Sequence, residues 1–388
     1  VEDADAAACA EALWHLHPVL AGELEKDGMD RLYREIEFPL CRVLYRMENR
    51  GICIDREQLR QFGDMLSRRI SDCETLIFSY SGGEFNINST RQLGELLFEK
   101  LGLPPVKKTK TGYSTNAEVL EKLKNKHPIV PAIMDYRMLT KLKSTYADGL
   151  MKEIREDGRI HTTFQNLITA TGRLSSTEPN LQNIPVRTDL GAEIRKMFVP
   201  REGYMLVDAD YSQIELRVLA HIADDKTMQQ AFCSGEDIHT ATAAQVFGVD
   251  KEQVTPLMRR HAKAVNFGIV YGISEFSLAE DIGVSRYEAR DYIDSYLANY
   301  HGVRDYMKKV VADARETGYT ETLYGRRRYI PELKSSNYNI RQGAERIALN
   351  TPIQGTAADL MKLAMIRVEM PLPPSSRKPG CCCRCMTN

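Results

Sequence analysis

The sequence lacks the features that mark several classes of protein. It contains no run of roughly 18 apolar residues, so we expect no transmembrane helix. Residues 1–10 show no basic stretch followed by an apolar one, which argues against a secretory signal and favours a cytoplasmic protein. The 52 basic residues are balanced by 53 acidic ones, giving a net charge of −1. A uniformly basic nucleic-acid-binding coat is therefore excluded, whereas a local basic cleft is not.

Cysteines at metal-binding spacing are also lacking. Four of the nine cysteines crowd the last eight residues, where a zinc site is the alternative interpretation. Adjacent cysteines point in different directions and cannot easily share one tetrahedral ion, so we interpret residues 371–388 as an unstructured tail. The other five stand singly, as reduced cysteines do: Cys9, Cys41, Cys53, Cys73 and Cys233.

What is present is a globular composition. Hydrophobic residues make up 43% and charged residues 27% of the chain. The length of 388 residues suggests two or three domains, at roughly 150 residues per domain. Apolar residues recur at helical spacing over residues 1–80, 216–318 and 339–370. Residues 158–215 turn to strand-type composition between these helical parts. A local sheet with helical flanks favours an α+β fold.

Finer signals place individual elements. Residues 159–164 and 204–210 are predicted as strands, and residues 320–329 as a hairpin. Asn88, Ser89 and Thr90 offer an N-cap for a helix over residues 91–100.

An apolar segment ends in acidic residues at 207–215, Val-Asp-Ala-Asp-Tyr-Ser-Gln-Ile-Glu. Side chains alternate along a strand, so Asp208 and Asp210 share one face. A carboxylate at the end of a buried strand is a plausible ligand for Mg²⁺, which prefers hard oxygens and substrate phosphates. A helix N-cap or a solvated turn is the alternative.

Arg259, Lys263, Phe267 and Tyr271 lie four residues apart. A step of four rotates a helix by about 400°, so this stripe drifts but stays on one side. Cations suit a triphosphate, and aromatic faces suit a base or a sugar. The alternative is an amphipathic helix whose aromatic residues belong to the core and whose cations are solvated.

Three local basic stretches are candidates for binding a phosphate backbone without sequence preference. Solvated surface charge is the alternative for the first and the third of them. They are residues 107–110, 259–263 and 326–328.

Several long motifs occur in one order along the chain and resemble those of the A family of DNA polymerases, the bacterial DNA polymerase I family. Residues 210–217, Asp-Tyr-Ser-Gln-Ile-Glu-Leu-Arg, resemble its motif A, and residues 259–272 resemble its motif B, the fingers helix. The resemblance covers roughly residues 1–370. Further matching segments are residues 171–176, 179–185, 237–239 and 350–359.

The resemblance implies a right-hand polymerase architecture of thumb, palm and fingers, mostly helical with a partial antiparallel palm sheet. The Lys107–Gly112 loop matches the thumb tip that grips duplex DNA, and Asp3 falls on a nuclease metal position without its partners. The implied domains are an exonuclease-like remnant at 1–35, the thumb and its base at 36–150, the first part of the palm at 151–215, the fingers at 216–342, a second part of the palm at 343–370 and a non-family tail at 371–388.

The resemblance also implies roles around a nucleotide. Asp210, not Asp208, matches the Mg²⁺-binding aspartate, assisted by the Tyr211 backbone carbonyl. Arg259 and Lys263 match catalytic residues that hold the triphosphate of the incoming dNTP, and Lys263 is the position linked to protonating pyrophosphate. The other implied nucleotide-site residues are Arg187 and His239 near the phosphates, Phe267 and Tyr271 at the base pair, Gln213, and Glu215, which blocks a ribose 2′-OH.

A second implied set touches primer–template DNA. Minor-groove acceptors are nearly alike for every base pair, so such contacts check pair shape without reading sequence. The set comprises Lys107, Lys108, Arg173, Asn183, Arg346, Asn350 and Gln354.

One motif of the family is not found. Its motif C, His-Asp-Glu, supplies the second aspartate of a two-metal site, and no such tripeptide occurs in these 388 residues. We therefore expect a monomeric fragment with one of the two metal carboxylates and weak or no turnover. One alternative is a non-catalytic module that binds primer–template and dNTP. The other is a single-subunit RNA polymerase, but Glu215 and the sequence Asp-Tyr-Ser-Gln-Ile-Glu at 210–215 argue against it.

Overall fold

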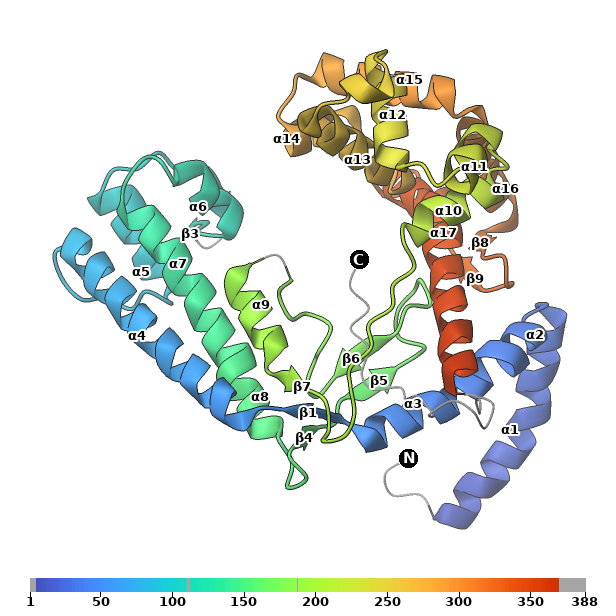
Figure 1. Ribbon diagram of the computed structural model, residues 1–388, viewed down its shortest axis with the longest axis horizontal. Helices are drawn as coiled ribbons and strands as arrows, with labels where there is room; N and C mark the ends of the chain where they lie inside the picture. Colours follow the sequence, from blue (N-terminus) through green and yellow to red (C-terminus); the bar gives the residue numbers. More distant parts are fainter. Residues whose placement is uncertain (1–4, 110–111, 187, 370–388) are drawn as a thin grey trace. The chain divides into compact units, whose positions relative to one another are not determined.

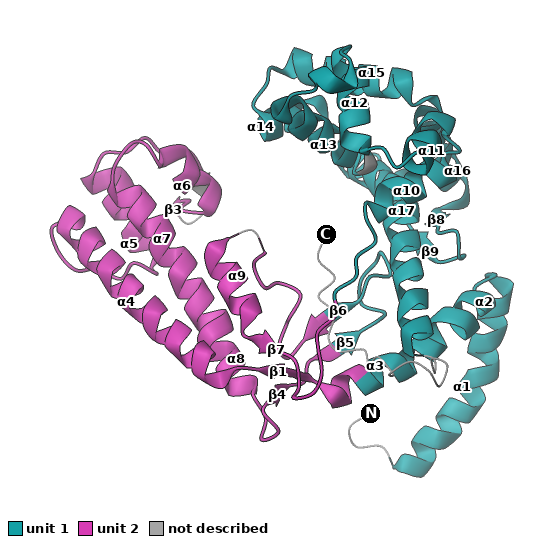
Figure 2. Ribbon diagram, in the orientation of Figure 1, with its two compact units in different colours: residues 1–46, 164–175, 208–381 teal, residues 47–163, 176–207, 382–388 magenta. Residues whose placement is uncertain are grey.

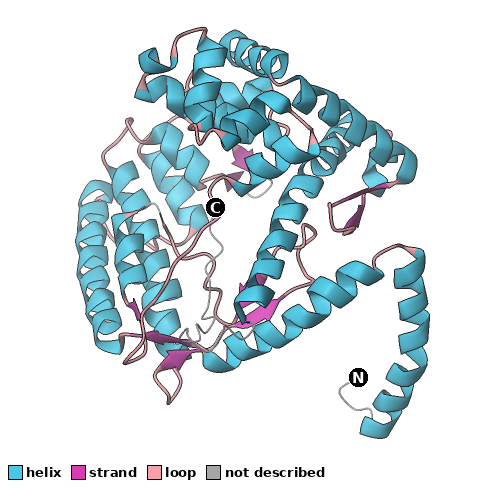
Figure 3. Ribbon diagram, turned by 45° about the vertical axis from the view of Figure 1, so that its right-hand side comes forward, coloured by secondary structure: helices cyan, strands magenta, loops and turns pink. Residues whose placement is uncertain are grey.

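The computed structural model describes residues 5–109, 112–186 and 188–369, which form two compact units (Figure 2). Of the described residues, unit 1 comprises 5–46, 164–175 and 208–369, and unit 2 comprises 47–109, 112–163, 176–186 and 188–207. Helices dominate both units and the strands are short (Figure 3). None of the helices in the described ranges has a stretch long and apolar enough to cross a bilayer.

Unit 2 is a group of helices beside a three-stranded sheet (Figure 1). Strand β1 pairs antiparallel with both β4 and β7, with Ile52 opposite Ile160 and Cys53 opposite Val199. The helices are α4 (Arg56–Ser81), α5 (Thr90–Gly94), α6 (Ala117–Leu123), α7 (Ile129–Leu142), α8 (Asp148–Glu153) and α9 (Asp189–Lys196), with π-helical turns η2 (Glu95–Lys100) and η3 (Lys143–Ala147). The strands are β1 (Ile52–Ile54), β2 (Lys108–Thr109), β3 (Gly112–Tyr113), β4 (Arg159–Ile160) and β7 (Phe198–Val199).

Local sequence explains where the unit 2 helices begin. The Asp55 side chain accepts a hydrogen bond from Gln58 N at 2.9 Å and caps α4, which then packs along α7. Ser89 caps α5 in the same way, so the predicted helix over 91–100 is confirmed as α5 followed by η2. Leu59 and Leu66 of α4 are fully buried in the core that these helices share with β1.

Unit 1 is almost entirely helical. Three elements, α3 (Phe38–Arg50), β5 (Thr163–Gln165) and β6 (Ser175–Thr177), contain points where the chain passes between units. The helices are α1 (Ala6–Lys26), α2 (Asp30–Leu32), α10 (Ile214–Ile222), α11 (Lys226–Cys233), α12 (Ile238–Phe247), α13 (Pro256–Val270), α14 (Glu275–Ile282), α15 (Arg286–Asn299), α16 (His301–Thr317) and α17 (Tyr338–Glu369). Short turns η1 (Tyr33–Glu37), η4 (Lys251–Gln253) and η5 (Pro331–Lys334) and the hairpin β8 (Tyr319–Glu321) and β9 (Arg327–Tyr329) complete it.

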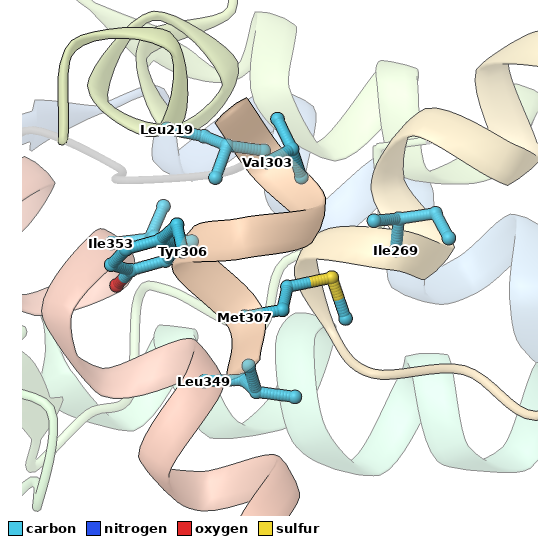
Figure 4. A pocket seen from close by; sticks show the side chains of 7 residues that line it. All are labelled: Leu219, Ile269, Val303, Tyr306, Met307, Leu349 and Ile353. Atoms are coloured by element: carbon cyan, nitrogen blue, oxygen red, sulfur yellow. The ribbon is translucent and has the colours of Figure 1, made fainter. Parts of the chain in front are cut away.

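The core of unit 1 is built where α10, α12, α13, α15, α16 and α17 pack together. Asp225 joins two of its helices, because its buried carboxylate caps α11 through Met228 N at 3.0 Å and also accepts from Gly302 N at 2.9 Å at the start of α16. A small apolar pocket of about 10 Å³, no more than the room for one water molecule, lies among these helices (Figure 4). Its lining consists of Leu219, Ile269, Val303, Tyr306, Met307, Leu349 and Ile353. No charged group lines it, so it offers no site for a triphosphate.

One expectation from the sequence is wrong. The segment 204–210 is not a strand: no described strand pairs with it, and Met205 and Val207 are 80% and 81% exposed. Its alternating apolar residues indicate strand propensity, but a strand also needs a neighbour to satisfy its backbone groups. The hairpin over 320–329 and the helix over 339–370 are confirmed as β8–β9 and α17.

The basic stretch 326–328 lies in this hairpin. The Arg326 side chain is 13% exposed and paired with Asp359, Arg327 stacks on Tyr319 at 4.5 Å from the ring centroid, and Arg328 donates to a threonine of α17. These arginines hold the hairpin to its surroundings and are not freely solvated charges, and their contact with a phosphate backbone stays a prediction.

Candidate functional site

The predicted stripe of cations and aromatic residues lies on α13. Thr255 caps this helix by accepting from Met258 N at 3.2 Å, and Pro256 occupies its first turn, where a missing N–H costs nothing. Arg259 and Lys263 are exposed, and Phe267 is half-buried. The helix therefore presents two cations followed by an aromatic ring, with Tyr271 at its C-terminal end.

Arg259 is held by a carboxylate on a neighbouring element. Its Nε and Nη2 donate to the two oxygens of Asp237 at 2.6 and 3.2 Å. Burial alone raises the pKa of Asp237, but the hydrogen bonds from Arg259 and Thr240 outweigh it and lower that pKa to about 2. Asp237 is thus ionised at neutral pH and orients Arg259, and a triphosphate must compete with it for the guanidinium.

His239, two residues later, is 3% exposed at the start of α12. Its Nδ1 lies 3.1 Å from Nδ2 of the buried Asn266 on α13, and Asn266 also bonds to Thr242. Burial lowers the pKa of His239 to about 4, and the nearby cations Arg259 and Lys263 add to this effect. Its predicted contact with a phosphate stays a prediction, because the imidazole is covered in this structure.

The lowered pKa of His239 predicts a pH-dependent stability. Below pH 6.5 the unfolded chain binds a proton at this residue and the folded chain does not, so stability falls by about 1.4 kcal/mol per pH unit until pH 4. His239→Gln removes the titrating group, and we expect it to flatten the pH dependence of the urea midpoint between pH 6.5 and 4. His15→Gln, at an exposed position, is the control for the substitution of a histidine by glutamine. An unaltered slope in His239→Gln contradicts the prediction.

Glu215, in the first turn of α10, is held by two partners. It is 6% exposed; Oε1 accepts from Arg173 Nη2, and Oε2 accepts from the Tyr271 hydroxyl at 2.8 Å. Burial and the Glu215 charge raise the pKa of Tyr271 to about 12, so the phenol remains a donor. Three residues from segments far apart in sequence therefore form one hydrogen-bonded group.

Two predicted site residues carry buried oxygens without partners among the described residues. They are Oε1 of Gln213, the residue just before α10, and Oδ1 of Asn350 on α17. Leaving a buried polar atom unpaired is costly, and such atoms often mark places where a ligand or water binds. Both residues lie in unit 1 with the stripe on α13 and with Glu215.

Arg346, Asn350 and Gln354 follow one another at four-residue spacing along α17. Arg346 is exposed, and the other two are half-buried. Gly272 permits a close approach at this point, because a Cβ on it would lie 2.9 Å from Arg346 Cγ. The turn after α13 thereby packs directly on the side chain of Arg346.

Asp210 and Tyr211 lie in the irregular segment before α10, and Asp208, Asp210 and Tyr211 are all exposed. The donor set of one or two carboxylates and a backbone carbonyl consists of hard oxygens and suits Mg²⁺ in type. Among the described residues no group of three His, Cys, Asp or Glu side chains could hold a metal ion. These residues therefore fit one side of a magnesium site that substrate phosphates would help to complete.

The remaining predicted contacts lie in unit 2. Lys107 is exposed beside the β2–β3 hairpin, and Asn183 is exposed while its carbonyl accepts from the Tyr146 hydroxyl. The side chain of Lys108 and all of Arg187 and Asp3 lie outside the described residues.

Sequence reasoning missed two residues that organise this site. Asp237 was part of a matching segment, and its position two residues before His239 was the available signal. Asn266 carries no such signal. An asparagine inside an amphipathic helix is expected on the polar surface, and only the structure shows that this one is buried.

Comparison with known proteins decides the family. A family model described as DNA polymerase family A matches residues 56–379. The chain belongs to DNA polymerase family A. It is 56% identical over 348 residues to DNA polymerase I of Caldicellulosiruptor bescii, and 53% identical over 359 residues to DNA polymerase I of Bacillus subtilis. These matches cover 89% and 92% of this chain, but the chain spans only 41% of either relative's length.

A solved structure supports the same assignment at the level of the fold. The chain resembles the POL domain of Pol1 from M. smegmatis, in a complex with DNA primer–template and dNTP, with a TM-score of 0.85 and 46% identity. The match covers 92% of this chain and 63% of that one. The predicted α+β fold with right-hand polymerase architecture is thereby confirmed.

Proposed function

We propose that this chain takes part in template-directed DNA synthesis, the transfer of a nucleotide from a dNTP to the 3′ end of a primer. One observation carries the proposal: the cationic and aromatic face of α13 ends at Tyr271, which is hydrogen-bonded to the buried Glu215. A triphosphate on Arg259 and Lys263 would place its sugar and base toward Phe267, Tyr271 and Glu215. Family membership supports the same reaction.

The chain's own residues would act as follows. Arg259, preoriented by Asp237, would bind phosphate oxygens through its fork of donors, and Lys263 would neutralise charge on the leaving pyrophosphate and donate a proton to it. Asp210 and the Tyr211 carbonyl would hold Mg²⁺, which supplies charge stabilisation to the transferred phosphoryl group. His239 and Arg187 would lie near the same phosphates, and Gln213 would meet the nucleotide through its unpaired oxygen.

Primer–template DNA is the second proposed partner. Arg173, Arg346, Asn350 and Gln354 of unit 1 would contact it, as would Lys107, Lys108 and Asn183 of unit 2. On this proposal residues 36–150 form the thumb and its base, residues 216–342 the fingers, and residues 151–215 and 343–370 the two parts of the palm. We also propose a monomer in the cytoplasm, which is where bacterial chromosomal DNA is found.

A non-catalytic, DNA-binding role is a second candidate for these 388 residues, because their sequence contains one of the family's two metal carboxylates. Two-metal catalysis needs both ions to stabilise the attacking and the leaving oxygen, and a site that lacks one carboxylate would hold the pair less well. We expect primer extension by this polypeptide to be at least about a thousandfold slower than that of a longer A-family polymerase assayed beside it. Rates within about tenfold of each other would exclude the second candidate.

DNA binding itself is tested by its dependence on salt. If about four phosphates are neutralised, the logarithm of the binding constant should fall with the logarithm of salt concentration with a slope of about −3.6. Fluorescence anisotropy of a labelled primer–template duplex measures this slope. Lys107→Ala should reduce its magnitude by about one, whereas Lys122→Ala, at an exposed lysine paired with Glu118, should not. Binding that is flat between low and moderate salt contradicts the proposal.

A further inference from the structure

Four charged residues, three of them buried and the fourth, Arg326, with a side chain 13% exposed, form a cluster that the proposed function does not use. The buried ion cluster consists of Glu37, Arg326, Asp359 and Lys362, all in unit 1. Asp359 is 0% exposed, Lys362 1% and Glu37 7%. Arg326 donates from Nε and Nη2 to Asp359 Oδ1 at 2.9 and 2.6 Å and from Nη2 to Glu37, and Lys362 donates to Glu37 Oε1 at 2.8 Å. The formal charges of the two cations and the two anions therefore sum to zero.

Further hydrogen bonds tie this cluster to the chain around it. Thr322 donates to Asp359 Oδ2 at 2.7 Å, and Lys362 reaches the Asn166 carbonyl at 3.3 Å. The cluster therefore joins η1, the segment after β5, the β8–β9 hairpin and α17. Breaking a buried pair by removing one partner costs more than the pair contributes, so the members of such a cluster are held in one arrangement.

A tight turn lies directly on the cluster. Gly172 has a φ of +79°, and a Cβ placed on it would be 2.5 Å from Arg326 Nε, so its backbone contacts the Arg326 side chain. The Thr171 carbonyl also lies close to α17, 3.3 Å from a Cβ built on Gly355. Within the turn, Gly172 N donates to the Thr169 carbonyl at 3.1 Å. The position of this turn is thereby set by Arg326 and α17.

The next residue of the turn is Arg173, whose guanidinium donates to Glu215. The Thr169 hydroxyl also donates to the Arg173 carbonyl at 2.5 Å, so the backbone on both sides of Arg173 is fixed. A long side chain loses roughly 2 kcal/mol of rotamer freedom when it is ordered for binding. Because the backbone of Arg173 is fixed, more of the entropy cost of ordering its side chain is met before a ligand binds.

We propose that Arg326, held in the buried ion cluster, is a positioning residue that fixes Arg173 for its contact with the minor groove of primer–template DNA. The inference rests on the proposed function, because it assumes that Arg173 contacts DNA. Arg326 touches no substrate; it acts through Gly172 and the turn. A purely structural cluster would stabilise the fold without any specific link to Arg173.

A double-mutant cycle separates these two roles. Arg326→Lys keeps the positive charge but loses the planar guanidinium that supports Gly172, and Arg173→Ala removes the proposed contact. We expect Arg326→Lys to weaken duplex binding about tenfold, the contribution of one charge-assisted hydrogen bond, and to change it less than about twofold when Arg173 is already alanine. Equal effects in both backgrounds would overturn the proposal. Arg328→Lys is the matched control, because Arg328 contacts Thr351 and not the turn.

A measurement without DNA tests the positioning itself. Phenylglyoxal reacts with accessible arginines, and mass spectrometry reports the rate at Arg173, which is about a third exposed and paired with Glu215. We expect a severalfold faster reaction in Arg326→Lys and no change in Arg328→Lys. If the wild-type chain fails to bind DNA, the proposed function is wrong. If phenylglyoxal modifies Arg173 at the same rate in Arg326→Lys as in the wild type, the positioning role is overturned independently.

A second variant guards against a failure to fold. Gly172→Ala inserts a methyl group against Arg326 Nε while all four charges remain, although its φ of +79° adds backbone strain. It should speed the Arg173 reaction as Arg326→Lys does. Gly83→Ala, where the added methyl group meets no atom within 4 Å, is its control.

Discussion

Lys362→Met should lower the free energy of unfolding by about 3–5 kcal/mol, the usual cost of leaving a buried charge without its partner. The lysine is 1% exposed, and its ammonium group donates to Glu37 and to the Asn166 carbonyl. Methionine has similar length but no charge. Glu37 would then share one cation, Arg326, with Asp359, and the buried ion cluster would carry a net negative charge.

Urea denaturation followed by circular dichroism measures this effect. Lys122→Met is the control, because Lys122 and Glu118 form an exposed pair whose loss costs at most about 0.5 kcal/mol. The double variant Lys362→Met with Glu37→Gln restores a neutral cluster of Arg326 and Asp359, and we expect it to recover at least about half of the loss. Similar small shifts in Lys362→Met and Lys122→Met contradict the prediction.

The sequence predicts features that depend on neighbouring residues better than features that depend on contacts between distant segments. The spacing of Arg259, Lys263 and Phe267 predicted one helix face, and α13 has that face, because periodicity depends on residues within a few turns. The segment 204–210 shows the opposite case. Its strand propensity was read correctly, but pairing depends on a neighbour that local sequence does not reveal.

The same distinction applies to charge. Three consecutive arginines at 326–328 indicate a basic surface when the sequence is read locally, yet Arg326 meets Glu37 across 289 positions of the chain. Glu215 was predicted as a nucleotide-site residue by resemblance, but its pairing with Arg173 and Tyr271 required the fold. The type of a residue indicates which chemistry its side chain can perform. Tertiary contacts decide which of the charged side chains remain available for a ligand.

Glu215→Ala is expected to raise the relative binding of ribonucleotides by about tenfold or more, the effect of removing a steric clash with a 2′-OH. The structure adds a reason why this glutamate would discriminate well. Arg173 and Tyr271 hold one carboxylate oxygen each, so the side chain cannot swing aside to admit a larger sugar. A mobile glutamate would discriminate less, because it could yield at little cost.

The measurement is competition between dNTP and rNTP for the complex of this chain with primer–template and Mg²⁺. Glu193→Ala, at an exposed glutamate paired with Lys196, is the control and should leave the ratio unchanged. Phe267→Tyr should instead improve binding of dideoxynucleotides, because an added hydroxyl can replace the lost 3′-OH contact, without admitting ribonucleotides. Equal losses for every nucleotide in both variants would indicate packing positions and contradict the assignment.

Tyr271→Phe tests whether the immobility of Glu215 matters. It removes the hydroxyl that donates to Glu215 Oε2 at 2.8 Å but leaves the ring and the carboxylate in place. If the clash alone sets selectivity, the ratio of rNTP to dNTP binding should match the wild type. If selectivity depends on a carboxylate held from two sides, the ratio should rise to a value between the wild type and Glu215→Ala. We expect the intermediate ratio, because a carboxylate held by Arg173 alone can rotate about its last bond and make room for a hydroxyl group.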